Sequence, residues 1–335
     1  MSSMSLLQKL SELSAVDCDT LDSKVAKDLG PFIDCTSNQA IAFFELAKTG
    51  VDGAPVHEKL IKESIRDAHW MLGREPDSTL EELAIEFMMV RLALDIVPSL
   101  SGYSHIQTNP RWSYNVQKTI KNAETPSYDT KRVCIKIPAT WEGLQACRAL
   151  EKHGIATLAT TLFCMEQAAM AADANCTYIA PYVNELKVHF EESYVDDHKA
   201  FALCGLAQRY YRNIKARTQV LPASLTSIDD VLALAGVDHI TVSPPLLTEL
   251  AATPAQGYKG EIGSVLKAAE SAQVDGKEKY EAILGDESAW RLAFTRSEAG
   301  KSEGKIIQAI NIFNDMQEKL EAIVSKADTQ LEPVD

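Results

Sequence analysis

A lysine at the end of a short β-rich segment is the residue of this sequence with the clearest chemical potential. The segment RVCIKIPAT, residues 132–140, has the alternating β-branched pattern of a strand, and it carries Lys136 shortly before Pro138. Burial disfavours the charged form of a lysine, and a neutral amine attacks ketones and aldehydes to form a Schiff base. The pattern equally fits a lysine that extends its ammonium to solvent at the edge of a sheet. The segment alone leaves both interpretations open.

Eight β-rich segments recur along the chain and alternate with amphipathic helical patterns such as NQAIAFFELAKT and WEGLQACRALEKHG. The β-rich segments are SAVDCDT, PFIDCTSN, YSHIQTN, RVCIKIPAT, IATLATTLF, CTYIAPYV, TQVLPAS and DHITVSP. No Pro/Gly/Ser-rich linker divides the chain, and none of its 16 glycines forms a GxGxxG or P-loop motif. The pattern therefore predicts an α/β fold, a single (β/α)8 TIM barrel over residues 1–335, with residues 286–326 as a C-terminal helical extension packing on the barrel.

The carboxyl ends of barrel strands meet at one mouth, where the active sites of such barrels lie. The predicted strands place seven polar side chains there: Asp19, Asn38, Gln107, Lys136, Thr160, Tyr182 and Ser224. A single lysine among neutral groups and one carboxylate suits Schiff-base chemistry, with Asp19 as the group that moves protons. Because the iminium itself withdraws electrons, we expect no metal and no organic cofactor.

Composition and charge narrow the class of protein. The 335 residues are 46% hydrophobic and 24% charged with a net charge of −14, which is typical of a soluble protein and unfavourable for binding nucleic acid. No apolar run approaches the roughly 20 residues that span a bilayer, so no membrane association is expected. The seven cysteines are scattered without a CxxC pair, which favours reduced thiols in a cytoplasmic protein. The run HFEESYVDDHKA, residues 189–200, contains two histidines, yet it is more typical of an exposed charged segment than of a metal site.

Several motifs resemble those of the transaldolase family. KIPATWEGLQACRALEKHGI is similar to the family's strand-four signature, and DCDTLD, CTSNQA, TNPRWSYN, TLFCMEQA and LALAGVDHITVSPPLLTEL also resemble family motifs. The similarity covers nearly the whole chain. The resemblance implies a (β/α)8 barrel that moves a three-carbon ketol unit between sugar phosphates through a lysine Schiff base.

The resemblance assigns roles to four matching residues. Lys136 takes the place of the Schiff-base lysine, and Asp19 takes that of the acid–base aspartate. Asn38 matches the asparagine that binds the donor's hydroxyls, and Thr160 matches the threonine that helps to hold a catalytic water. The implied partner is a small-molecule carbonyl substrate, and because members of the family are often dimers, the resemblance also suggests a homodimer.

The sequence departs from the family pattern on strands three and five. Gln107 occupies the position of a glutamate that works with the threonine through water, and Asn109 occupies that of a neighbouring aspartate. Glutamine takes no proton at neutral pH, so the usual water-mediated relay is not expected here. On strand five, Leu158 stands where the family has an asparagine.

Strands six and seven lack both arginines that bind phosphate in the family. Glu185 and Thr226 stand at those positions, and Tyr182 replaces a phenylalanine. Each charged hydrogen bond is worth roughly 1.5–3 kcal/mol, so the two losses weaken phosphate binding by about 3–6 kcal/mol. We therefore expect an unphosphorylated substrate, with Glu185 attracting an amine and Tyr182 positioning a water or donating a proton. Ser224, Thr226, Leu158 and Asn109 are expected to contact the substrate as well.

Three interpretations of the function remain open. The first is a Schiff-base enzyme of specialised metabolism that uses Lys136 and Asp19 on an unphosphorylated carbonyl compound, by aldol cleavage or addition, transfer or ring closure. The second is a conventional pentose-phosphate transaldolase that moves a dihydroxyacetone unit between sugar phosphates. The third is a non-catalytic scaffold, and the retained lysine counts against it because fold stability does not require a buried, unpaired lysine.

Overall fold

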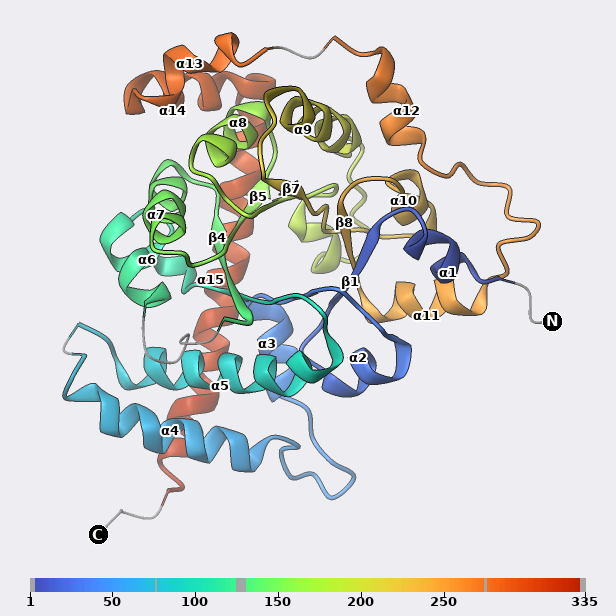
Figure 1. Cartoon of the computed structure of the whole chain (residues 1–335). Coiled ribbons are helices and arrows are strands. Elements are labelled where there is room, and N and C mark those ends of the chain that lie inside the picture. The colour runs from blue at the N-terminus through green and yellow to red at the C-terminus, as the bar shows by residue number, and fades with distance from the viewer. Residues whose placement is uncertain (1–3, 76, 125–130, 274–275, 332–335) are drawn as a thin grey trace.

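Eight parallel strands form a nearly closed barrel at the centre of the computed structural model (Figure 1). The structure describes residues 4–75, 77–124, 131–273 and 276–331. The strands lie in the order β7-β6-β5-β4-β3-β2-β1-β8, so consecutive strands are neighbours and β8 lies beside β1. Their bounds are β1 Ala15–Asp19, β2 Cys35–Thr36, β3 Ser104–Gln107, β4 Val133–Pro138, β5 Thr157–Leu162, β6 Tyr178–Pro181, β7 Gln219–Val220 and β8 His239–Val242.

Each predicted β-rich segment contains one of these strands, which confirms the predicted (β/α)8 barrel. The strands β4 and β5 are buried along their whole length. Burial on both faces is expected for parallel strands that have helices on the outside and packed side chains on the inside. Where β7 approaches β8, the Thr241 N–H donates a hydrogen bond to the Pro222 carbonyl at 3.3 Å.

Helices cover the outside of the barrel, and several begin at side chains that satisfy their first backbone N–H groups. Thr79 and Glu82 form a capping box at the start of α5, and Thr140 caps α7. The helices up to β8 are α1 Leu6–Ser11, α2 Ser23–Leu29, α3 Gln39–Leu46, α4 Glu58–Leu72, α5 Leu80–Ile96, η1 Val97–Ser99, η2 Pro110–Trp112, α6 Val116–Ala123, α7 Trp141–Lys152, α8 Met165–Asp173, η4 Leu186–His189, α9 Phe201–Ile214 and α10 Ile228–Ala233. Within the described residues, no helix is long and apolar enough to cross a bilayer.

The chain after β8 is helical. It forms α11 Pro244–Ala252, α12 Ser264–Ser271, α13 Glu278–Leu284, α14 Glu287–Arg296, η5 Ser297–Gly300 and α15 Lys301–Asp328. The long α15, drawn in red, runs along the barrel and packs against α3, α4 and α5 (Figure 1). Its buried residues include Ile306, Ile310, Phe313 and Leu320, a spacing that gives one apolar face. The helices α14, η5 and α15 occupy the residues predicted as a C-terminal extension.

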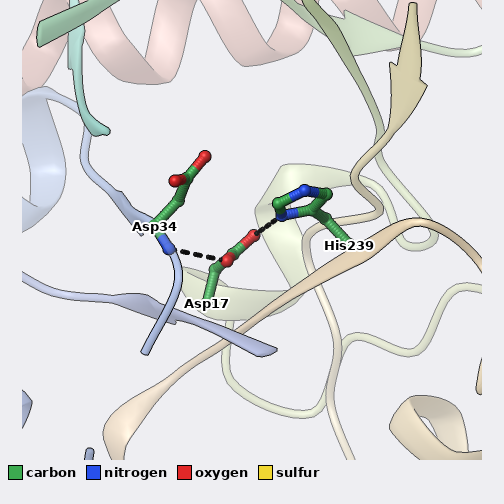
Figure 2. A group of neighbouring side chains, drawn as sticks. All are labelled: Asp17, Asp34 and His239. Atoms are coloured by element: carbon green, nitrogen blue, oxygen red, sulfur yellow. Dashed lines mark hydrogen bonds and ion pairs between the residues drawn. The ribbon is translucent and has the colours of Figure 1, made fainter. Parts of the chain in front are cut away.

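A buried ion-pair network includes Asp17, Asp34 and His239, the three side chains drawn in Figure 2. Asp17 Oδ2 lies 2.9 Å from His239 Nδ1, and Asp17 Oδ1 accepts a 2.9 Å hydrogen bond from the Asp34 N–H. Asp34 Oδ2 lies 2.8 Å from His105 Nε2, and its Oδ1 accepts a 2.6 Å bond from the Tyr103 N–H. Two carboxylates and an imidazole this close are donors suited to a metal ion. However, all four carboxylate oxygens already have protein partners, so we interpret the cluster as an ion-pair network, in which His105 Nδ1 is buried without a hydrogen-bond partner among the described residues.

The network shifts the ionisation of its members in opposite ways. Burial raises the pKa of Asp17 and outweighs the lowering effect of His239. Burial also acts to raise the pKa of Asp34, but its bonds to His105 and Tyr103 prevail and lower it. Burial acts to lower the pKa of His239, yet the Asp17 carboxylate outweighs burial and raises it. The Asp17–His239 pair therefore holds a proton more tightly in the folded protein than in the unfolded chain.

We expect Asp17→Asn to lower the free energy of unfolding by about 3–5 kcal/mol, because it removes one partner of a buried ion pair. The unaltered protein binds more protons at His239 in the folded than in the unfolded state, between the ordinary histidine pKa of about 6.5 and the raised one. Its free energy of unfolding should therefore fall as the pH rises through the raised pKa of His239, and the variant should lose this slope. Urea denaturation at several pH values between about 6 and 8 measures both effects.

Glu12→Gln, which breaks the exposed Lys9–Glu12 pair, is the matched control and should change little. An Asp17→Asn protein that keeps the pH slope of the unaltered chain contradicts the assignment of that slope to the Asp17–His239 pair.

Candidate active site

A cavity of about 470 Å³ opens at the carboxyl ends of the strands. Six of the residues predicted for the site line it: Asp19, Asn38, Lys136, Tyr182, Ser224 and Thr226. The lining also includes apolar side chains from the loop after β6, from α3 and from the start of α11. A largely apolar cavity with a few convergent polar groups is the usual form of a small-molecule site.

Lys136 is fixed at the base of this cavity by the register of three strands. Its Cα pairs with Gln107 on β3 and with Leu158 on β5, so the three side chains point to the same face of the sheet. The lysine is only 1% exposed, and its Nζ has neither an ion pair nor a hydrogen bond with any residue that the structure describes. The nearest aromatic ring is that of Tyr182, whose centroid lies 5.9 Å from Nζ.

Asp19 is oriented by a chain of two threonines. The Thr36 hydroxyl donates to Asp19 Oδ1 at 2.6 Å, and the hydroxyl oxygens of Thr36 and Thr241 are also 2.6 Å apart. Since Thr36 has only one proton to donate, Thr241 is the donor in the second bond. This chain fixes one carboxylate oxygen and leaves Asp19 Oδ2 for the cavity.

Gln107 and Thr160 lie in the barrel wall beside Lys136 and carry buried oxygens without a partner. The Gln107 amide donates to Gln39 Oε1 at 2.8 Å, which leaves Gln107 Oε1 without a hydrogen bond, and Thr160 Oγ1 has none either. The chain bulges between Thr160 and Leu162, and Thr161 has a φ of +57°. Bulges and strained backbone of this kind occur near active sites, where they direct a side chain. The two unpaired oxygens are suited to bind a water or a substrate hydroxyl.

Asn38 has two functions at the start of α3. Its Oδ1 accepts hydrogen bonds from the N–H groups of Ala40 at 2.9 Å and Ile41 at 3.0 Å, which caps the helix. Within the described residues its Nδ2 makes no hydrogen bond, so the amide presents a donor to the cavity. A donor at this position is consistent with the predicted binding of substrate hydroxyls.

Three predicted substrate contacts lie outside the cavity lining. Leu158 is fully buried beneath it, and Asn109 caps η2 and donates to Glu82 Oε1. Glu185 is 3.7 Å from Lys187 and 3.8 Å from Lys305 on α15. Because its charge is met by these two lysines, the expectation that Glu185 attracts an amine-bearing substrate is not supported by this geometry.

The segment 189–200 is mostly exposed, as predicted, but His189 also lines the cavity, a position that the sequence pattern did not indicate. Its Nε2 lies 3.0 Å from the Ser224 hydroxyl. Ser224 has a φ of +60°, and its carbonyl accepts a 2.7 Å bond from Asn184 Nδ2 that holds this strained conformation. His189 could have been predicted from its place in the loop after β6, because the loops that follow the strands of such a barrel face its mouth.

The cavity has few cationic groups. Among the residues that the structure describes, Lys136 and His189 are the lining residues that can carry positive charge, and none of the lining residues is an arginine. Partial burial lowers the pKa of His189, and the Asp19 carboxylate acts in the opposite direction without outweighing it. Arg111, the nearest arginine in sequence to strand three, forms a two-pronged ion pair with Glu321 on α15.

Comparisons with known proteins agree with the site. A family model described as Transaldolase/Fructose-6-phosphate aldolase matches residues 16–302. A protein named transaldolase from Chlamydia caviae is 30% identical over 337 residues, covering 96% of each chain. Transaldolases from Acidobacterium capsulatum and Alteromonas mediterranea are 28% and 30% identical and cover 99% and 94% of this chain, and 99% and 96% of their own. The chain therefore belongs to the transaldolase/fructose-6-phosphate aldolase family and is an enzyme of the aldolase and transaldolase type.

Proposed function

We propose that Lys136 forms a Schiff base with a ketone or aldehyde substrate and uses it to break or form a carbon–carbon bond. The observation that carries this proposal is a buried lysine without a counter-ion at the base of a cavity that also holds an aspartate. Family membership favours an enzyme over a non-catalytic scaffold.

The geometry gives each neighbouring group a task in this reaction. The Lys136 amine attacks the carbonyl carbon, and loss of water leaves an iminium. When the adjacent carbon–carbon bond breaks, its electron pair moves to the iminium and gives an enamine. Asp19 Oδ2 takes the proton of the substrate hydroxyl on the far carbon of that bond, which becomes the carbonyl of the leaving aldehyde. The Asn38 amide donates to a substrate hydroxyl, and Tyr182 lies beside the reacting nitrogen. In the reverse direction the same groups join an enamine to an aldehyde.

The cavity lining favours a substrate without phosphate. Phosphate sites in proteins normally use arginine, lysine or helix N-termini, and here no arginine lines the cavity. At one of the two positions expected to bind phosphate, the Thr226 hydroxyl donates to Asp230 Oδ2 at 2.9 Å, which adds negative charge nearby. We therefore infer an uncharged polyhydroxylated carbonyl compound as the preferred substrate.

A second candidate is the conventional reaction, the transfer of a three-carbon unit between sugar phosphates. The relatives named transaldolase, which match this chain over nearly its whole length, favour this alternative over a specialised substrate. Both candidate reactions use Lys136 in the same way. They differ in whether the end of the substrate remote from the carbonyl carries a phosphate.

Borohydride trapping read by intact mass tests the Schiff base. We expect dihydroxyacetone to give the unaltered protein a covalent mass increase after reduction, because the iminium forms on Lys136. Lys136→Met should abolish this adduct. Lys131→Met is the matched control, since it removes a lysine from the same segment outside the cavity lining, and it should trap as well as the unaltered chain. Equal trapping by Lys136→Met contradicts the proposal.

Thr226→Arg tests the inference about phosphate. We expect the new guanidinium to lower the fructose 6-phosphate concentration that gives half-maximal trapping by about tenfold, with little effect on fructose, because one charge-assisted pair is gained. Thr226→Gln is the neutral control of similar reach. If the unaltered chain already prefers fructose 6-phosphate to fructose strongly, the conventional reaction is the better assignment and the phosphate is held by other groups.

A further inference from the structure

Schiff-base formation needs a base that takes a proton from the attacking nitrogen and an acid that protonates the departing hydroxyl. Attack of the Lys136 amine on a carbonyl gives a carbinolamine, and its hydroxyl must be protonated before it leaves as water. Gln107 occupies the wall beside Lys136 but has no ionisable proton. Asp19 already serves the carbon–carbon bond step in the proposed function. The cavity therefore needs another group that both takes and gives a proton near neutral pH.

His189 has the position and the chemistry for this task. It lines the same cavity as Lys136 and Asp19. The Ser224 hydroxyl lies 3.0 Å from its Nε2 and fixes the ring orientation. Imidazole is the side chain that most often acts as general acid and base in proteins.

We propose that His189 is a catalytic acid–base residue that transfers protons during formation and hydrolysis of the Lys136 Schiff base, an inference that rests on the proposed function. The Lys136 nitrogen lone pair forms the new bond to the carbonyl carbon, and the neutral His189 imidazole takes the proton released from that nitrogen. The resulting imidazolium gives this proton to the carbinolamine hydroxyl, the carbon–oxygen bond breaks, and water leaves as the iminium forms. The alkoxide left by the attack takes a proton from solvent to become the carbinolamine hydroxyl, and this proton accounts for the positive charge of the iminium. Hydrolysis reverses each step.

The charges around His189 suit a group that changes protonation during the reaction. Asp19 on β1 stabilises the imidazolium, and Lys136 on β4 and the Tyr182 phenol just after β6 are the other titratable groups of the lining. On its own segment, Lys187 is paired with Glu185. Partial burial lowers the pKa of His189, so the ring is neutral at pH 7 and ready to act as a base.

The test is the rate of adduct formation with dihydroxyacetone, measured by mixing for timed intervals, quenching with excess borohydride and reading intact mass between about pH 5 and 8. For the unaltered protein we expect the rate to change through an inflection below about pH 6.5, the ordinary pKa of histidine. His189→Gln should slow adduct formation by roughly 100-fold and lose this inflection, because general acid–base catalysis contributes about that much. His153→Gln, at an exposed position away from the cavity, is the histidine control and should behave like the unaltered chain.

Two rescue experiments separate proton transfer from a structural role. Free imidazole should restore part of the rate to His189→Ala. Gln107→Glu, introduced into the His189→Gln protein, should also restore it, because a carboxyl group beside Lys136 supplies the missing proton. If the second variant fails to fold, the imidazole rescue still decides the question.

The outcomes distinguish this inference from the function on which it rests. A protein that forms no adduct with any carbonyl compound overturns both. Normal adduct formation that is unchanged in rate and pH profile by His189→Gln overturns only the role of His189. A variant that alters the concentration dependence but keeps the pH inflection shows a binding role and likewise overturns the proposal.

Discussion

The burial of one lysine without a counter-ion is the constraint on which the rest of the site depends. Lys136 and Lys305 are both nearly inaccessible, at 1% and 6% exposure, yet Lys305 lies within 4 Å of Glu185 and Asp196. Lys136 has no such partner among the described residues. An unpaired buried ammonium is costly, and the cost falls when the nitrogen is neutral or joined to a carbonyl carbon. The fold pairs the buried Lys305 with two carboxylates and leaves Lys136 without one. This difference singles out Lys136 as the reactive lysine.

Two features of the backbone hold the neighbouring groups against this lysine. In the parallel register, Gln107, Lys136 and Leu158 lie in one row, so the lysine extends between a polar and an apolar neighbour. Left-handed backbone occurs at Thr161 and Ser224, directly beside Thr160 and below His189. Such conformations cost roughly 1–3 kcal/mol for residues other than glycine and persist where the surrounding structure enforces them. The rigid barrel supplies this enforcement at these two positions.

The sequence predicted the parts of the molecule that depend on local pattern. Alternating β-branched residues located all eight strands, and the strand ends then placed Asp19, Lys136 and Tyr182 at one mouth. Three features depend on contacts between distant segments and were not predicted. The Asp17–His239 pair joins residues 222 positions apart that meet only when β8 closes on β1. Glu185 is neutralised from α15, and His189 is directed inward by a loop whose charged composition resembles an exposed surface.

Glu185, which the family resemblance matches to an arginine, is held by contacts with α15. An arginine at this position would face Lys305, whose Nζ also donates to the His198 carbonyl at 3.2 Å and is held within the fold. Glu185 instead forms an ion pair with Lys305 and accepts a 3.0 Å bond from Gln308, so the carboxylate links the loop after β6 to α15. That loop carries His189 at its end. The Glu185–Lys305 pair therefore ties the loop that carries His189 to α15.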